Sequence, residues 1–367
     1  MTDNIKTTCL HDRHLSLGAQ MSPFAGFDMP IQYEGITEEH MAVRNACGVF
    51  DVSHMGEVNI SGPDAERFVN HIFTNDIAGA PDGKIFYGMM LRADGGTVDD
   101  LLVYRRGANN FLLVINASNI DKDIEWIKSQ SEGYDVEIDD LSDALGELAI
   151  QGPEAEKVME QELGITCADL AFYTFREASL DGAHILVSRT GYTGEDGFEV
   201  YADHDTICKL WDRLMESGRA KPCGLGCRDT LRFEVGLPLY GHELADDISP
   251  IESGLSMFVK LDKEGGFIGR DAVAAQKADG PSKRVVGLQL ADKAIPRAGY
   301  DVLDAEGRKV GYITTGYRSP STDASVAMAL IEAASAAKGT QLQVQIRRRT
   351  FPATVVAKRF YQKNYKK

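Results

Sequence analysis

The sequence predicts an α+β protein made of two related α+β units and a small C-terminal β-barrel or sandwich. The first observation is a duplication: residues 56–67 (GEVNISGPDAER) and 146–157 (GELAIQGPEAEK) share one pattern. In both, an alternating strand runs into Gly-Pro and then a helix with an acidic first turn, where the missing N–H of Pro is tolerated. The second is a series of short alternating strands from Arg284 onward. The third is a Gly-, Lys- and Ala-rich boundary at 262–283.

The elements follow in order from a Pro- and Gly-punctuated loop near the N-terminus. Thr37 is expected to cap a helix that runs to Cys47, with Gly48 as its stop. The two duplicated units come next, each expected to be a sheet with helices on one face. We predict three domains, formed by residues 1–50 with 145–265, by residues 51–144, and by residues 280–367.

Composition limits the functional classes. The chain has 367 residues and a net charge of −16, so nucleic acid and anionic membranes are unsuitable partners. No apolar run reaches the length of a membrane span, and the N-terminus lacks a signal-peptide core, so a cytoplasmic location is expected. The six cysteines include no Cys-x-x-Cys pair, and the chain has no Walker loop or dinucleotide-binding glycine pattern. We therefore expect neither a metal nor a nucleotide.

Two adjacent carboxylates, Asp99 and Asp100, follow a Gly-Gly turn and open an apolar strand that runs to Tyr104. Neighbouring strand side chains point to opposite faces, so only one of the two acids can face a given cavity. An acid at the start of a buried strand is costly unless it caps the turn, meets a cation or serves chemistry. The alternative to a functional pair is that Asp99 caps the turn and Asp100 is solvated.

Two further charged residues stand beside glycine-rich turns. Glu199 follows the loop 191–197 and alternates with apolar neighbours, so it points away from the apolar face of its strand. The simplest alternative is an exposed strand residue. Arg228 stands at a helix start with Asp229 directly behind it. The alternative there is a surface Arg–Asp pair, which contributes at most about 1 kcal/mol.

Taken together, five stretches resemble the T-protein family, the aminomethyltransferases of the glycine cleavage system. The resemblance runs in order over nearly the whole chain, and the ordered set is far more specific than any single piece. The chain departs from the family pattern at Phe27, Cys227, His242 and Arg318, and none of these replaces an acid or base assigned below. The five stretches are Phe50-Asp51-Val52-Ser53-His54-Met55, Gly95 to Tyr104, Gly191 to Glu199, Gly224 to Glu234, and Thr314-Thr315-Gly316 with Ser319-Pro320.

The resemblance implies three domains in a cloverleaf around a central folate site. It implies that Asp100 is the catalytic carboxylate and that Glu199, Arg228 and Tyr365 bind folate. The positions expected to line the folate pocket are Tyr87, Met55, Asn116, Tyr173 and Tyr192.

The resemblance also implies a reaction. A lipoyl carrier protein (the H-protein) delivers an aminomethyl group on sulfur, tetrahydrofolate accepts the one-carbon unit as co-substrate, and ammonia leaves. Asp100 would stabilise positive charge that develops on the carbon as the C–S bond breaks. Glu199 suits the amino-pyrimidinone edge of the pterin, because a carboxylate accepts two parallel hydrogen bonds. A monomer is expected.

Two other functions stay open at this point. One is a tetrahydrofolate-dependent demethylase of a sulfur or amine compound, and the other is a non-enzymatic folate-binding relative. Relatives of the second kind carry a Lys-Gly-Cys-Tyr-x-Gly-Gln motif, whereas this chain reads Gly226-Cys227-Arg228-Asp229.

The C-terminal segment is strongly basic. Residues 341–367 contain eight Lys and Arg and no Asp or Glu, a local charge of +8 in a chain of net charge −16. The segment either neutralises the acidic remainder of the same molecule or docks an acidic carrier.

Overall fold

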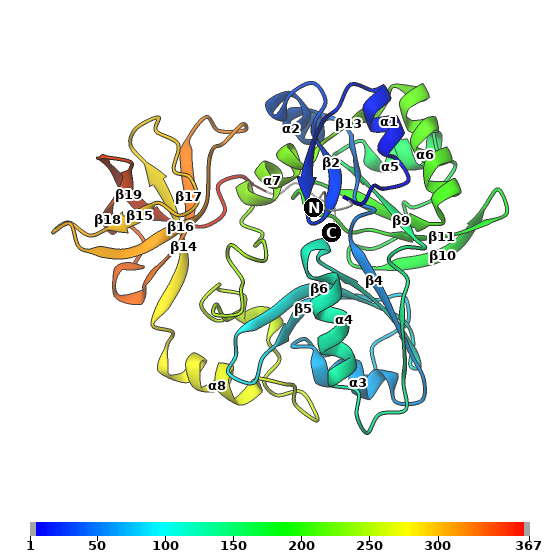
Figure 1. The fold of residues 1–367 in the computed structure, drawn as a ribbon, viewed down its shortest axis with the longest axis horizontal. Coiled ribbons are helices and arrows are strands. Elements are labelled where there is room, and N and C mark those ends of the chain that lie inside the picture. The colour runs from blue at the N-terminus through cyan, green and yellow to red at the C-terminus, as the bar shows by residue number, and fades with distance from the viewer. Residues whose placement is uncertain (1–4, 363–367) are drawn as a thin grey trace.

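The computed structural model describes residues 5–362, and two open sheets and a closed barrel dominate it (Figure 1). The six-stranded sheet has the order β10-β11-β12-β9-β3-β13, the five-stranded sheet β5-β6-β7-β4-β8, and the barrel β14-β17-β16-β15-β18-β19. This confirms the predicted α+β class and shows that the C-terminal strands form a barrel, not a sandwich. The barrel strands are β14 (Lys283–Leu290), β15 (Asp301–Leu303), β16 (Lys309–Arg318), β17 (Ser325–Glu332), β18 (Gln341–Ile346) and β19 (Arg349–Val356).

The duplication seen in the sequence reappears as a repeated strand order. The order β5-β6-β7-β4-β8 corresponds to β10-β11-β12-β9-β3, and the six-stranded sheet adds only β13 (Lys221–Pro222). The first set is β4 (Gly56–Ser61), β5 (Ile85–Leu91), β6 (Thr97–Gly107), β7 (Asn110–Ile115) and β8 (Glu137–Asp140). The second is β3 (Gly48–Asp51), β9 (Gly146–Gln151), β10 (Phe175–Leu180), β11 (Ala183–Ser188) and β12 (Gly197–Ala202).

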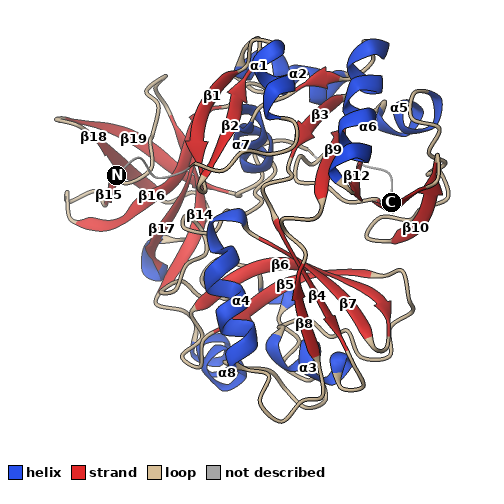
Figure 2. Ribbon diagram, turned by 45° about the vertical axis from the view of Figure 1, so that its right-hand side comes forward, coloured by secondary structure: helices blue, strands red, loops and turns tan. Residues whose placement is uncertain are grey.

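Both sheets carry helices on the outer face, but the six-stranded sheet departs from the expected one-face arrangement, because α2 (Ile36–Asn45) and α7 (Leu225–Glu234) pack against Phe50 and Ala149 on its other face. Helices α3 (Ala65–Ile72) and α4 (Ile120–Ser129) pack on the five-stranded sheet, and α5 (Ala155–Gln161) and α6 (His204–Ser217) on the six-stranded one. The two inner faces meet in a shared apolar cluster that includes Tyr104, Leu112, Leu186 and Tyr201. In Figure 2 the two sheets accordingly lie one above the other, with these helices directed outward. The space between the inner faces is where the site residues gather.

The N-terminal region corrects one prediction. Helix α2 spans Ile36–Asn45, so Thr37 lies within it and does not cap it. The carboxylate of Glu39 instead accepts hydrogen bonds from the backbone N–H groups of residues 33, 34 and 35 at 2.6–3.2 Å. Gly48 opens β3, and a side chain there would collide with Val43 and Cys223, so close packing explains the glycine. The preceding elements are α1 (His11–Ser16), β1 (Gln20–Phe24) and β2 (Phe27–Gln32).

Two segments connect the sheets to the barrel. Helix α7 (Leu225–Glu234) contacts α2, β2 and barrel strand β16. Residues 244–273 pack on the five-stranded sheet through Leu244, Ile251 and Val273. The domain division stays a prediction. Helix α8 (Arg270–Asp279) then leads to the barrel, and no helix in residues 5–362 is long and apolar enough to cross a membrane.

Candidate functional site

Asp99 and Asp100 open strand β6, and the structure gives them different surroundings. Asp99 is fully buried, and its carboxylate accepts hydrogen bonds from Asn116 N (3.0 Å), Asn116 Nδ2 (2.8 Å) and Asn119 Nδ2 (2.8 Å). It does not cap the turn, because Asp94 accepts the backbone N–H of that turn at 3.1 Å. The alternative of a capping Asp99 and a solvated Asp100 is therefore wrong.

Asp100 lies on the inner face of the five-stranded sheet. Its carboxylate accepts a hydrogen bond from the hydroxyl of Tyr87 (2.8 Å) and one from Asn116 Nδ2 (3.0 Å). Burial, followed by the charge of Asp99, raises the pKa of Asp100 to about 7. The Tyr87 ring is held edge-on by Phe258, with ring centroids 4.8 Å apart. The arrangement fixes a carboxylate that exists in both protonation states near neutral pH.

Glu199 lies on the inner face of the six-stranded sheet, on strand β12. Its neighbours Phe198 and Val200 belong to the outer core, so strand alternation directs Glu199 toward the other sheet. The hydroxyl of Thr190 donates a hydrogen bond to Glu199 Oε2. Burial raises the pKa of Glu199, while Thr190 and Arg228 act in the opposite direction. The alternative of an exposed strand residue is wrong.

Arg228 stands in the first turn of α7 and does not pair with Asp229. Asp229 instead accepts hydrogen bonds from Arg232 Nε (2.7 Å) and from the hydroxyl of Tyr317. The guanidinium of Arg228 lies over the ring of Tyr192, 4.7 Å from its centroid, and makes no ion pair within residues 5–362. The surface-pair alternative is thus wrong, and the cation stays available for a carbonyl or carboxylate of a ligand.

The remaining predicted residues are placed as follows. Met55 contacts both the inter-sheet cluster and the cluster around α7. Tyr173 adopts a φ of 61°, and its carbonyl accepts the N–H of Ile85 at 3.0 Å, which links the two sheets. Asn116 bridges Asp99 and Asp100. Tyr365 lies outside the described residues.

One site residue escaped the sequence analysis although it belongs to a quoted motif. His54 is 1% exposed, and its ring makes edge-on contacts with Phe24 (centroids 5.6 Å apart) and Phe27 (6.3 Å). Its Nδ1 has no hydrogen-bond partner in the part of the chain that the structure describes. Burial, and then the charge of Arg228, lowers the pKa of His54 to about 4. A neutral imidazole therefore stands near the guanidinium of Arg228. The motif around His54 did not indicate this burial, because the two phenylalanines that contact the ring come from a separate hairpin.

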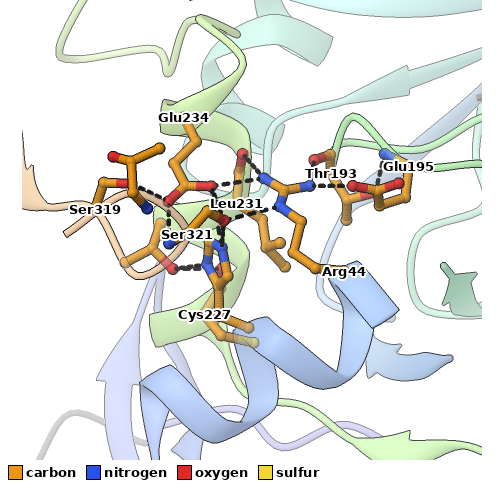
Figure 3. Close-up of polar contacts among 11 residues, drawn as sticks. Arg44, Thr193, Glu195, Cys227, Leu231, Glu234, Ser319 and Ser321 are labelled. Atoms are coloured by element: carbon orange, nitrogen blue, oxygen red, sulfur yellow. Dashed lines mark hydrogen bonds and ion pairs between the residues drawn. The ribbon is translucent and has the colours of Figure 1, made fainter. Parts of the chain in front are cut away.

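A buried polar junction holds the far end of α7 (Figure 3). The carboxylate of Glu234 accepts hydrogen bonds from Ser319 Oγ, Ser321 Oγ (2.6 Å) and Arg44 Nη2 (3.0 Å), and His40 Nε2 lies 3.1 Å away. Burial alone would raise the pKa of Glu234, but His40 and the serine donors outweigh it and lower the pKa to about 2. Residues of helix α2 and of the barrel domain thus contact the same carboxylate, that of Glu234.

The junction extends to the loop that precedes Glu199. Arg44 Nη1 donates to Thr193 O (2.7 Å) and to Glu195 Oε1 (2.9 Å), as Figure 3 shows. The backbone carbonyl of Glu234 accepts the N–H groups of residues 360 and 361 at 2.8 Å each. The helix that presents Arg228 is therefore fixed to α2, the glycine loop, the barrel and the C-terminal segment together.

Within the described residues, one group has metal-ligand types close together. It consists of Glu39, Cys223 and Cys227, all buried, with their candidate ligand atoms within 4.8 Å of one another. Both carboxylate oxygens of Glu39 already accept backbone N–H groups, including that of Gly224 at 2.8 Å. Burial also raises the pKa of the Cys227 thiol. These groups are thus engaged in fixing the entry to α7.

Comparison with known proteins agrees with this geometry. The model of the GCVT N-terminal domain matches residues 10–263, and that of the glycine cleavage T-protein C-terminal barrel domain matches residues 283–362. An aminomethyltransferase of Alkaliphilus oremlandii is 48% identical over 99% of both chains, and one of Thermoanaerobacter pseudethanolicus is 46% identical over 100% of both. The crystal structure of glycine cleavage system aminomethyltransferase T from Bartonella henselae superposes with a TM-score of 0.94 at 32% identity, covering 99% of this chain and 100% of that one.

The chain therefore belongs to the glycine cleavage T-protein family, a class of folate-dependent transferases. Its fold, with several sheets and a six-stranded C-terminal barrel, is that of the family. Its activity is that of the aminomethyltransferase of the glycine cleavage system.

Proposed function

We propose that the space between the two sheets is the active site, where Asp100 acts on an aminomethyl group carried by a lipoyl protein and tetrahydrofolate is the co-substrate. The observation that carries this proposal is that Asp100 and Glu199 lie on facing inner surfaces, with Arg228 beside Glu199. Both sides of the site come from one chain, so the enzyme acts as a monomer in this proposal. The cytoplasmic location stays a prediction.

The residues present fit a reduced folate. Glu199 offers two oxygens to the amino-pyrimidinone edge, and Arg228 has no other anionic partner within residues 5–362. Tyr87, Tyr173 and Tyr192 supply aromatic surface. When bound, tetrahydrofolate supplies the nitrogen nucleophiles that take up the one-carbon unit. This chain's own residues hold it and exclude water.

Asp100 supplies the electrostatic part of the mechanism. Tyr87 and Asn116 fix its carboxylate before the substrate arrives, so no reorganisation is needed when positive charge develops on the carbon. In the low-dielectric space between the sheets, this interaction is stronger than in water. The carboxylate also orients the attacking nitrogen.

The experiment that tests the function measures ammonia released from an aminomethylated lipoyl carrier, with and without tetrahydrofolate. We expect release that depends strongly on tetrahydrofolate. Methyl transfer from a sulfonium or methylamine compound without activity on the carrier would instead indicate a demethylase. Folate binding without any turnover would indicate a non-enzymatic relative.

We further propose that the carrier docks on the basic β18–β19 hairpin. Arg347, Arg348 and Arg349 are exposed at its turn and form no ion pair within the described chain. Lys358, in contrast, is directed inward and donates a hydrogen bond to the carbonyl of Ser253. Only part of the basic segment is therefore exposed for docking. Lys363, Lys366 and Lys367 lie outside the described residues.

Replacing Arg347 and Arg349 with Glu should raise the Michaelis constant for the carrier at low salt. Added salt should raise the same constant in the wild-type enzyme, because screening weakens electrostatic steering of the carrier. Folate affinity should move little. Reversal of Lys283 and Arg284, two exposed barrel residues on β14, is the matched control. If the Arg347 and Arg349 reversal left carrier kinetics unchanged and lowered the melting temperature, the hairpin would instead serve to neutralise acidic groups of the same molecule.

A further inference from the structure

Two buried carboxyl groups between the sheets take no part in the mechanism above. Glu57 on β4 and Glu147 on β9 occupy equivalent positions of the duplicated segment, and both are almost inaccessible to solvent. Among the described residues, neither oxygen of Glu57 has a hydrogen-bond partner, and Glu147 Oε2 has none either. Burial raises the pKa of both well above the ordinary value. Both groups are therefore neutral carboxylic acids, because an unpaired charge at this depth would be far more costly.

A row of hydroxyl groups runs from beside Glu147 to Glu199. Thr190 Oγ1 contacts Glu199 Oε2, and Ser188 Oγ lies 2.6 Å from Thr190 Oγ1. The hydroxyl of Tyr104 lies 3.3 Å from Ser188 Oγ and 3.0 Å from the hydroxyl of Tyr201. The row crosses between the sheets, since Tyr104 comes from β6 and the others from the six-stranded sheet or the loop that follows β11.

The row ends at Tyr201, beside Glu147. Tyr201 and Glu147 are direct cross-strand partners on β12 and β9, with both side chains on the inner face.

Proton counting gives the row one direction. Each hydroxyl has one proton to donate. Thr190 uses its proton on the Glu199 carboxylate, so it must accept the proton of Ser188. Ser188 then accepts from Tyr104, and Tyr104 from Tyr201. The weak alternative acceptor for Ser188, the carbonyl of Glu199 at 3.5 Å, does not compete with the 2.6 Å contact.

We propose that Tyr201, Tyr104, Ser188 and Thr190 form an ordered hydrogen-bond relay that keeps Glu199 charged for folate recognition, which makes Tyr201 and Tyr104 positioning residues. Hydrogen bonds in a chain polarise one another, so each hydroxyl of the row strengthens the donor that reaches the Glu199 carboxylate. No net proton transfer is involved. The inference rests on the proposed role of Glu199 at the pterin.

The charged and titratable groups around Glu199 set the expected pH dependence. Arg228 faces it from α7, Tyr104 from β6 and Glu147 from β9, with Glu57 behind Glu147. Folate binding requires the anion, so affinity is full above the pKa of Glu199 and falls as the pH drops through it. Loss of the relay raises that pKa, and the fall then begins at a higher pH.

The test is calorimetric titration with tetrahydrofolate over a series of pH values. Thr190→Val should weaken binding about tenfold at neutral pH and move the acid limb upward, since a hydrogen bond to a charged group is lost. Tyr201→Phe and Tyr104→Phe should move the limb the same way by a smaller amount. Tyr134→Phe, on the helix-covered face beside Phe68, is the control and should not change the profile.

Two results would overturn the relay while leaving the proposed function intact. The first is a shift for Thr190→Val with a wild-type profile for Tyr201→Phe, which would end the chain at Thr190. The second is an equal loss of affinity at every pH for Tyr201→Phe and Tyr104→Phe, which would be a packing effect. If the wild-type enzyme bound no tetrahydrofolate at all, the proposed function itself would fail.

Discussion

Replacing Asp100 with Asn should lower turnover by about 10²- to 10³-fold, the cost of removing one preorganised electrostatic group from an active site. Affinity for tetrahydrofolate should change far less, because the carboxylate acts mainly on the charge of the transition state. Single-turnover measurement of ammonia release, combined with folate titration, separates the two quantities. The Asn side chain keeps the size of Asp100 and can still contact Tyr87, so misfolding is not expected to contribute.

The pH profile gives a second check on Asp100. With a pKa of about 7 the group loses its charge on acidification, so turnover should fall as the pH drops through that value. Asp99→Asn is the matched variant. On sequence alone a mild effect is expected of it. The structure adds that removing the Asp99 charge should lower the pKa of Asp100 and move the acid limb to lower pH. Near-wild-type turnover in both variants would refute the assignment of the pair.

Replacing Glu199 with Gln should weaken tetrahydrofolate binding by about 1–3 kcal/mol, since the buried donors of the pterin edge lose their charged acceptor. The turnover number at saturating folate should change much less than the affinity, which distinguishes this variant from Asp100→Asn. Calorimetry supplies the affinity and steady-state kinetics the turnover number.

Glu137→Gln is the matched control for Glu199, because Glu137 is an exposed glutamate on edge strand β8. It should leave both quantities unchanged. Equal affinities for the wild type and Glu199→Gln would show that this carboxylate does not hold the pterin.

The sequence was sufficient for the parts of the fold that local patterns encode. The strand, Gly-Pro and helix pattern at 56–67 and 146–157 predicted two related sheets, and the repeated strand order shows why both copies fold alike. The alternation around Glu199 correctly gave its direction, away from the apolar face. It could not show that a second sheet covers that direction, because such packing joins residues far apart in the chain.

The remaining errors have the same origin. Arg228 and Asp229 are neighbours in sequence, but the helix places Asp229 one turn before Arg232, and that pair forms instead. Helix α2 begins beside Thr37, yet the buried Glu39 carboxylate satisfies the amides that precede it. His54 becomes part of the site only because a distant hairpin closes over it. In each case tertiary contacts override the local preference.

The repeated sheets also show how one site can arise from two equal halves. A symmetric pair of identical chains repeats every interface residue, so each acid would occur twice. Here the halves have diverged: β11, the counterpart of β6, has no acid, and neither does β7, the counterpart of β12. Asp100 therefore occurs only on one side and Glu199 only on the other. Because the two halves are covalently linked, each meets the other at a high effective concentration. The two facing surfaces can therefore acquire different residues while the halves still associate.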